Sequence, residues 1–170
     1  MRCWQSKITD GPPADFKHAL AVASPASGVI LPLEDSKNPL IALRCLGEGV
    51  VLKLTGQQVF SPVTGKIVEF LPTCQLIKIK ASNGMSLQIS FVEDISKLMA
   101  EKFYIDARKG QAIKQGESLF RFDINLLKTN HIAPLLAVTI TNAARAQCVV
   151  PIQYQRKVMA SIDNLMTLYL

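Results

Sequence analysis

Histidine and cysteine are the side chains of this chain best suited to accept a phosphoryl group or bind a metal, and both are sparse. The sequence contains two histidines and four cysteines, at His18, His131, Cys3, Cys45, Cys74 and Cys148. They lie far apart, without the Cys-x-x-Cys or His-x-His spacing of a zinc site. We therefore expect reduced thiols and surface histidines, with no metal, no cofactor and no zinc hydrolase activity.

The composition of the 170 residues is that of a folded domain, with 49% hydrophobic and 19% charged residues. The net charge is +6, but the 19 Lys and Arg residues are dispersed and do not interleave with aromatic residues, so nucleic-acid binding is not predicted. No apolar run reaches the ~20 residues of a membrane-spanning helix. Gly11-Pro12-Pro13 stands where a signal peptide would have its apolar stretch, which favours a cytoplasmic location.

Residues 1–19 are predicted to form a flexible N-terminal arm, because they show no hydrophobic period and contain turn-forming residues. Trp4 and Ile8, with Arg2 and Lys7 nearby, allow weak contact with a membrane surface or a partner. An unpacked tail is the simpler interpretation, since so few apolar residues bury little area. The remaining residues, 20–170, are predicted to form one domain.

Short β-prone runs alternate with turn residues from residue 21 onward. They lie at Val22–Ile30, Val50–Leu54, Val59–Phe60, Ile67–Leu71, Leu76–Ala81, Leu87–Phe91, Ser118–Phe122, Ala137–Thr141 and Leu165–Leu170. Many short strands at this spacing predict an all-β, mostly antiparallel sandwich or barrel. Helical turns are expected only at Asp94–Ala100 and at Asp123–Lys128, where Asp123 would act as the N-cap.

A short motif occurs twice, 37 residues apart, as Ser24-Pro25-Ala26-Ser27-Gly28 and Ser61-Pro62-Val63-Thr64-Gly65. Pro fixes φ at the start of a turn and Gly permits a positive φ at its exit, so both copies predict sharp turns. The repeat suits a sandwich with two similar halves. The second copy is not a phosphate-binding loop, because Lys66-Ile67 follows its glycine where that loop needs Lys-Ser or Lys-Thr.

Asn83-Gly84 between two β-prone runs predicts a β-hairpin with a two-residue type I′ turn. That turn would place Ile77 opposite Ser90, with Gln75 diagonal to Ser90 on the same face, roughly 7–8 Å away. Two polar groups would then lie close enough to act together.

An ordered series of motifs in this chain resembles the glucose-type enzyme IIA of the bacterial sugar phosphotransferase system. The motifs are Ala23–Leu33, Leu46-Gly47-Glu48-Gly49-Val50, Thr55-Gly56, Ser61–Gly65 and Lys109–Phe122. They follow the family's order and spacing from about residue 21 to about residue 142. The resemblance implies the family's antiparallel β-sandwich, also described as a barrel-sandwich hybrid.

The family resemblance also implies a site built from two histidines. One follows a Thr-Asn pair and accepts phosphate from the carrier HPr, and the other lies in a Val-His-Phe-Gly run and supports the phosphoryl group. Here the corresponding runs read Thr73-Cys74-Gln75 and Ile89-Ser90-Phe91-Val92. Thr73 and Asp94 match the family, whereas Gln75 and Ser90 occupy the histidine positions, so no catalytic residue is expected.

An amide and an unassisted hydroxyl cannot replace two imidazoles in phosphoryl transfer. The amide lone pair of Gln75 is delocalised, and the hydroxyl of Ser90 needs a base that Gln75 cannot provide. The prediction is a regulatory, phosphate-free enzyme IIA homologue, a pseudoenzyme, that binds HPr, a transporter or a metabolic enzyme. The alternative is an active phosphocarrier in sugar transport that uses Cys74 as its acceptor.

The family docks its partners through an apolar face with an acidic edge. The matching positions around Gln75, Ser90 and Asp94 are Leu40, Ile41, Leu46, Leu71 and Gln88. Asn38 and Leu43 replace two acidic residues of the family, so an arginine-bearing HPr should be attracted more weakly. Ordinary core packing is the alternative role for the apolar members of this set.

Overall fold

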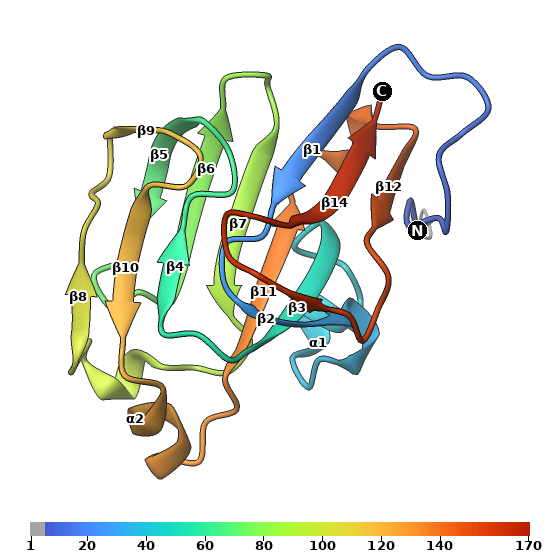
Figure 1. The fold of residues 1–170 in the computed structure, drawn as a ribbon. Helices are drawn as coiled ribbons and strands as arrows, with labels where there is room; N and C mark the ends of the chain where they lie inside the picture. The colour runs from blue at the N-terminus through green and yellow to red at the C-terminus, as the bar shows by residue number, and fades with distance from the viewer. Residues whose placement is uncertain (1–5) are drawn as a thin grey trace.

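The computed structural model describes residues 6–170, which form three antiparallel sheets around one core (Figure 1). The largest sheet has eight strands. In spatial order these are β13 (Lys157–Val158), β2 (Gly28–Pro32), β3 (Glu48–Leu54), β11 (Leu135–Ile140), β7 (Ser86–Phe91), β6 (Leu76–Ala81), β5 (Gly65–Phe70) and β9 (Ala112–Ile113). This sheet carries the predicted hairpin near its middle.

Two three-stranded sheets complete the sandwich. One contains, in spatial order, β1 (Ala19–Ala23), β14 (Asn164–Tyr169) and β12 (Cys148–Pro151), and the other β4 (Gln58–Phe60), β10 (Ser118–Phe122) and β8 (Phe103–Ile105). Helices are short: α1 (Pro39–Ala42), α2 (Ile124–Thr129) and three 3₁₀ turns at 33–35, 96–98 and 143–145. No helix among the described residues is long and apolar enough to cross a membrane.

The main core lies between the three sheets, where the inward side chains of the strands meet. Four rings form its aromatic part, Phe91, Phe103, Phe120 and Phe122, with centroids 5.6 to 6.2 Å apart. A second, smaller cluster covers the other face of the large sheet, where Ile41 of α1 packs with residues of β3 and β11. Burying such side chains supplies most of the driving force for folding.

The predicted strands are present, with two kinds of difference. Val22–Ile30 is two strands, β1 and β2, because the Pro-containing turn separates them. The strands β8, β9, β12 and β13 and the helix α1 were not predicted, since segments of two to four residues carry too little periodic signal. The Asp123 carboxylate accepts a hydrogen bond from the Asn125 N–H (2.9 Å) and caps α2, as predicted.

The two Pro-containing turns of the repeat bind each other. The Ala23 N–H donates to the Pro62 carbonyl (3.2 Å), and the Phe60 N–H donates to the Pro25 carbonyl (2.7 Å). These reciprocal bonds hold the two halves of the sandwich together at equivalent points. The internal repeat in the sequence therefore corresponds to a real structural pairing.

The hairpin turn differs from its prediction. Ser82-Asn83-Gly84 form a three-residue loop in which Ala81 N–H donates to the Met85 carbonyl (2.8 Å) and Gly84 has a φ of +90°. This is the pattern of a hairpin loop with a glycine bulge rather than a type I′ turn. The extra loop residue shifts the register by one.

The register shift changes which residues share a face. Ser90 lies opposite Leu76, and Ile77 lies opposite Ile89. Because side chains alternate along a strand, a shift of one residue moves Ile77 to the other face from Ser90. The prediction that Gln75, Ile77 and Ser90 share one face is wrong.

The described part of the N-terminal arm contacts the folded body. The Thr9 N–H donates to the Val149 carbonyl (3.1 Å), the Val149 N–H donates to the Lys7 carbonyl (2.8 Å), and Ile8 is half-buried against the core. Arg2, Cys3 and Trp4 lie outside the described residues. The arm's flexibility and its contact with a membrane stay predictions.

Candidate functional site

Gln75 lies in the turn between β5 and β6, and its side chain is fully used in hydrogen bonds. The amide Nε2 donates to the carbonyls of Phe91 (2.9 Å) and Glu93 (3.2 Å), and Oε1 accepts from the Ile95 N–H (2.7 Å). A glutamine amide has two donor hydrogens and one acceptor oxygen, so both ends are engaged. Gln75 therefore ties the segment 91–95 to the start of the hairpin.

Ser90 lies on β7 in a row of opposed residues that crosses the sheet. Leu76 is its partner on β6, and Ala137 is its partner on β11. The residue is 7% exposed, and among the described residues no hydrogen bond joins its hydroxyl to another group. No hydrogen bond links it to Gln75, so the paired action expected from the hairpin geometry is not seen.

Cys74 is a core residue. It is 2% exposed, and burial raises the pKa of its thiol to about 12. At neutral pH the thiolate is then a fraction of about 10⁻⁵ of the total, whereas an ordinary cysteine has a few per cent. The Cys74 backbone has a φ of +59°, an uncommon conformation for a residue other than glycine or asparagine.

Thr73 and Asp94 flank the same region. Thr73 is half-buried, and Asp94 is exposed. The Asp94 carboxylate accepts a hydrogen bond from the Ser96 N–H (2.8 Å). The pKa of Asp94 lies below its usual value chiefly because of its hydrogen bond with the Ser96 side chain, and secondly because of this backbone bond. These bonds hold Asp94 at the start of the 3₁₀ turn at 96–98.

The predicted docking residues differ widely in exposure. Leu40 is 54% exposed, Leu46 and Leu71 are half-buried, and Gln88 and Ile41 are 4% and 1% exposed. Ile41 packs in the small cluster of α1, so core packing accounts for it. The structure thus offers Leu40, Leu46 and Leu71 as accessible apolar positions.

Two further residues of this face, Asn38 and Leu43, lie at the two ends of α1. Asn38 caps α1 by accepting a hydrogen bond from the Leu40 N–H (3.0 Å), and its amide donates to the Val92 carbonyl (3.2 Å). Leu43 is 71% exposed at the end of α1. The cap signal was present in the sequence, because Asn before Pro39 is a common start of a helix.

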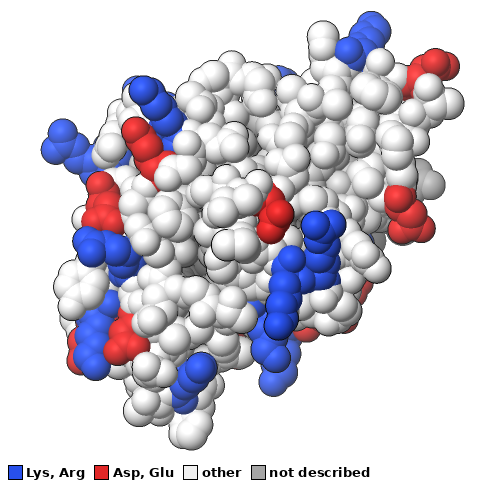
Figure 2. Space-filling view, in the orientation of Figure 1, with Lys and Arg blue, Asp and Glu red and all other residues white. Residues whose placement is uncertain are grey.

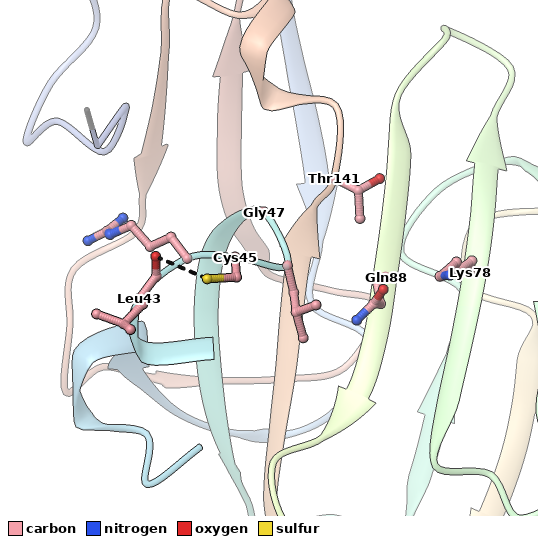
Figure 3. Close-up of a pocket in the computed structure, with 8 residues that line it drawn as sticks. Leu43, Cys45, Gly47, Lys78, Gln88 and Thr141 are labelled. Atoms are coloured by element: carbon pink, nitrogen blue, oxygen red, sulfur yellow. Dashed lines mark hydrogen bonds between the residues drawn. The ribbon is translucent and has the colours of Figure 1, made fainter. Parts of the chain in front are cut away.

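A pocket of about 400 Å³ opens beside these residues, between the loop 43–47 and the β6–β7 hairpin. Figure 3 shows Gln88 on β7 between Lys78 on β6 and the loop that carries Leu43 and Cys45. Its lining combines apolar side chains with polar and charged ones, namely Leu43, Cys45 and Leu46 with Arg44, Lys78, Gln88 and Thr141. It is the best-formed concave feature next to the predicted docking face.

Charged residues near this face are paired. The Arg44 guanidinium binds the carboxylates of Glu34 and Glu48, and Lys78 binds Glu69 (2.8 Å). Figure 2 shows Lys and Arg at separate places on the visible side of the molecule, several of them next to an acidic side chain. Among residues 6–170 no group of three or more His, Cys, Asp or Glu side chains is arranged to hold a metal ion.

Both histidines are exposed and take no part in this arrangement. His18 precedes β1, and His131 follows α2 with a φ of +57°. Neither side chain has a hydrogen bond or ion pair with another described residue. Among the described residues, no hydrogen bond or ion pair joins either imidazole to Gln75 or Ser90.

Comparison with known proteins decides the family. The sequence model of the phosphoenolpyruvate-dependent sugar phosphotransferase system, EIIA 1, matches residues 20–146. The chain belongs to the glucose-type enzyme IIA family. Its similarity to the "PTS system glucose-specific EIIA component" of Bacillus cereus is 32% identity over 128 residues, covering 75% of this chain and 78% of that one. The Staphylococcus epidermidis protein of the same name is 28% identical over 130 residues, covering 76% and 78%.

The fold of this enzyme IIA homologue agrees with a solved structure. The glucose permease IIA from Mycoplasma capricolum matches with a TM-score of 0.78 at 20% identity, over 89% of this chain and 96% of that chain. The mostly antiparallel β-sandwich predicted for the family is therefore confirmed. The family match also ends near residue 146, close to the limit of about residue 142 that the motifs indicated.

Proposed function

We propose that this enzyme IIA homologue does not carry phosphate and acts as a binding or regulatory protein of the sugar phosphotransferase system. We infer that Gln75 and Ser90 stand at the two histidine positions of the family. The observation that carries the proposal is the Gln75 amide, whose donors and acceptor are all engaged with the backbone of 91–95. Such an amide is no nucleophile, and its side chain already has a structural role.

The thiol alternative has little physical support. A cysteine that accepts a phosphoryl group must be exposed and react as its thiolate, and Cys74 is buried with a pKa raised to about 12. Ser90 is no better suited, because among the described residues no hydrogen bond joins its hydroxyl to a base that would remove its proton. Neither residue supplies the nucleophile that relay from HPr requires.

A protein that transfers no phosphoryl group can still bind partner proteins. Leu40 of α1 and Leu43, which directly follows α1, are exposed apolar residues, and Leu46 and Leu71 are half-buried. Exposed apolar residues grouped on one side of a protein are typical of an interaction surface. The partner would be HPr, a transporter or a metabolic enzyme, and the predicted cytoplasmic location is part of this proposal.

The first prediction is that the protein gains no phosphoryl group from HPr. The protein is incubated with phosphoenolpyruvate, enzyme I and HPr, and its intact mass is measured. We expect no change in mass, because no nucleophile is available at position 75 or 90. The glucose-specific protein of Bacillus cereus serves as the positive control in the same mixture, and a stoichiometric gain of one phosphoryl group by the present protein would reject the proposal.

Cys74→Ser decides between the proposal and the thiol alternative if any phosphate is gained. Loss of the added mass in Cys74→Ser would identify Cys74 as the acceptor. Retention of the added mass would exclude that thiol and direct the search to another side chain.

A further inference from the structure

The side-chain amide of Gln88 borders a pocket and has no hydrogen-bond partner among the described residues. The residue is 4% exposed on the central strand β7. Its side chain borders the pocket between the loop 43–47 and the hairpin (Figure 3). Among the described residues Ser161 Oγ alone is a fully buried side-chain polar atom without a partner, so the Gln88 amide atoms are accessible from the pocket and a molecule inside it can pair with them.

The side chains that line the pocket indicate which other chemical group the ligand carries. Leu43 and Leu46 supply apolar surface, and the pocket volume of about 400 Å³ is within the range of sites that hold a small molecule or a side chain. A branched aliphatic group suits walls of this kind. The ligand should therefore combine an aliphatic group with a partner for the amide.

The charges around the pocket argue against an anionic ligand. Lys78 is already paired with Glu69 (2.8 Å), and Arg44 is paired with Glu34 and Glu48. A carboxylate or phosphate entering here would have to displace an existing ion pair. A neutral group that both donates and accepts matches Gln88 without that cost, and the peptide group is the commonest such group in proteins.

We propose that this pocket recognises a neutral peptide group carrying an aliphatic side chain, presented by a docking partner. The inference rests on the proposed docking function and specifies the chemistry of the partner segment. Leu43 would pack on the aliphatic side chain, and the Gln88 amide would pair with the peptide group.

The test uses N-acetyl-leucinamide as the probe and N-acetyl-leucine, which is anionic at neutral pH, as the comparison. Both are titrated into the full chain while the side-chain NH₂ resonances of Gln88 are followed by NMR. We expect saturable shifts with the amide and binding of the carboxylate that is weaker by about fivefold, since its charge has no free cation to pair with. Equal binding of the two compounds, or no shift of the Gln88 resonances, would overturn the proposal.

Gln88→Met tests the amide directly, because it keeps the side-chain length and removes the hydrogen-bonding groups. We expect about fivefold weaker binding of N-acetyl-leucinamide, the value of one lost hydrogen bond. Gln147→Met, at an exposed glutamine before β12, is the matched control and should bind like the unmodified chain. Unchanged affinity in Gln88→Met would contradict the assigned role of the amide.

Cys45 provides a second measurement that needs no change at position 88. Its thiol is exposed and borders the pocket, whereas Cys74 and Cys148 are buried. In a Cys3→Ser background, bound N-acetyl-leucinamide should slow the reaction of Cys45 with a maleimide, and an unchanged rate at saturating probe would count against the site. A gain of phosphate in the phosphoenolpyruvate reaction would reject the proposed function alone, whereas failure of the Gln88 and Cys45 measurements would reject this inference alone.

Discussion

At the scale of single residues, Gln75 has a structural role. The Gln75 amide binds two carbonyls and one N–H in the segment that leads from β7 into the 3₁₀ turn. An imidazole could not make all three bonds at once, because it has only two ring nitrogens. The Gln75 side chain therefore holds the segment that contains Asp94.

Gln75→Glu should destabilise the protein at neutral pH. The carboxylate keeps the shape of the side chain but cannot donate to the carbonyls of Phe91 and Glu93, so we expect a loss of about 1–3 kcal/mol in the free energy of unfolding. Urea denaturation measures it. Gln147→Glu, at an exposed position, is the control. An equal loss of stability in both variants would contradict the stabilising role of the Gln75 hydrogen bonds.

The buried thiol of Cys74 should make the free energy of unfolding depend on pH in the alkaline range. Its folded pKa is raised to about 12 by burial, above the usual value of about 8.5 for an exposed thiol. The thiol therefore favours the folded state fully below about pH 8.5 and loses that contribution as the pH rises toward 12. Between pH 7 and pH 10 the unmodified protein should lose about 2 kcal/mol more stability than Cys74→Ala, and parallel pH profiles of the two proteins would show that the thiol is not buried in solution.

At the scale of elements, the loop of the β6–β7 hairpin fixes which side chains reach the docking side. Its three residues set Ser90 opposite Leu76, and the row from Leu76 through Ser90 to Ala137 follows from that register. A two-residue turn would have shifted every side chain of one strand to the opposite face. The position of Gln88 in the pocket depends on the same loop.

Gly84→Ala should weaken this hairpin through backbone strain alone. Gly84 has a φ of +90° and open space where a Cβ would lie, so the expected cost of about 1–2 kcal/mol comes from the left-handed conformation and not from a clash. Gly11→Ala is the control, because Gly11 also has open space but no positive φ. Thermal denaturation of both variants measures the difference, and equal melting temperatures would indicate that the loop adopts another turn.

At the scale of the whole molecule, we expect the net charge of +6 and the lack of acidic side chains at Asn38 and Leu43 to act in the same direction. The resemblance to the family implies acids at these two positions, and the charged residues near the pocket are paired with one another. If the proposed docking face binds a basic partner such as HPr, we expect weak long-range attraction and recognition through shape and apolar contact.

Leu43→Glu should restore part of that attraction. Leu43 is 71% exposed, so a carboxylate there remains hydrated, and association with HPr should become several-fold faster at low salt with a smaller gain at high salt. Surface plasmon resonance at two ionic strengths measures the association rate. Ile162→Glu, at a 73% exposed position near β14, adds the same charge elsewhere, and an equal effect of both changes would mean that net charge alone controls the encounter.

The sequence by itself determined the longer strands, the repeat and the side-chain types present at the site. Alternating apolar residues specify strands locally, and side-chain type alone decides that Gln75 is no nucleophile. The motifs between residues 21 and 142 were enough to indicate the family that the comparisons show.

The tertiary structure alone decided the hairpin register, the burial of Cys74 and the position of Gln88 at a pocket. A local pattern does not distinguish a two-residue from a three-residue loop around Asn83-Gly84, and that one residue decides which face each side chain occupies. Burial depends on what packs across from a residue, and those neighbours, such as α1 over β3 and β11, come from distant parts of the chain. For this reason the short helix α1 and the pocket beside it were visible only once the chain was folded.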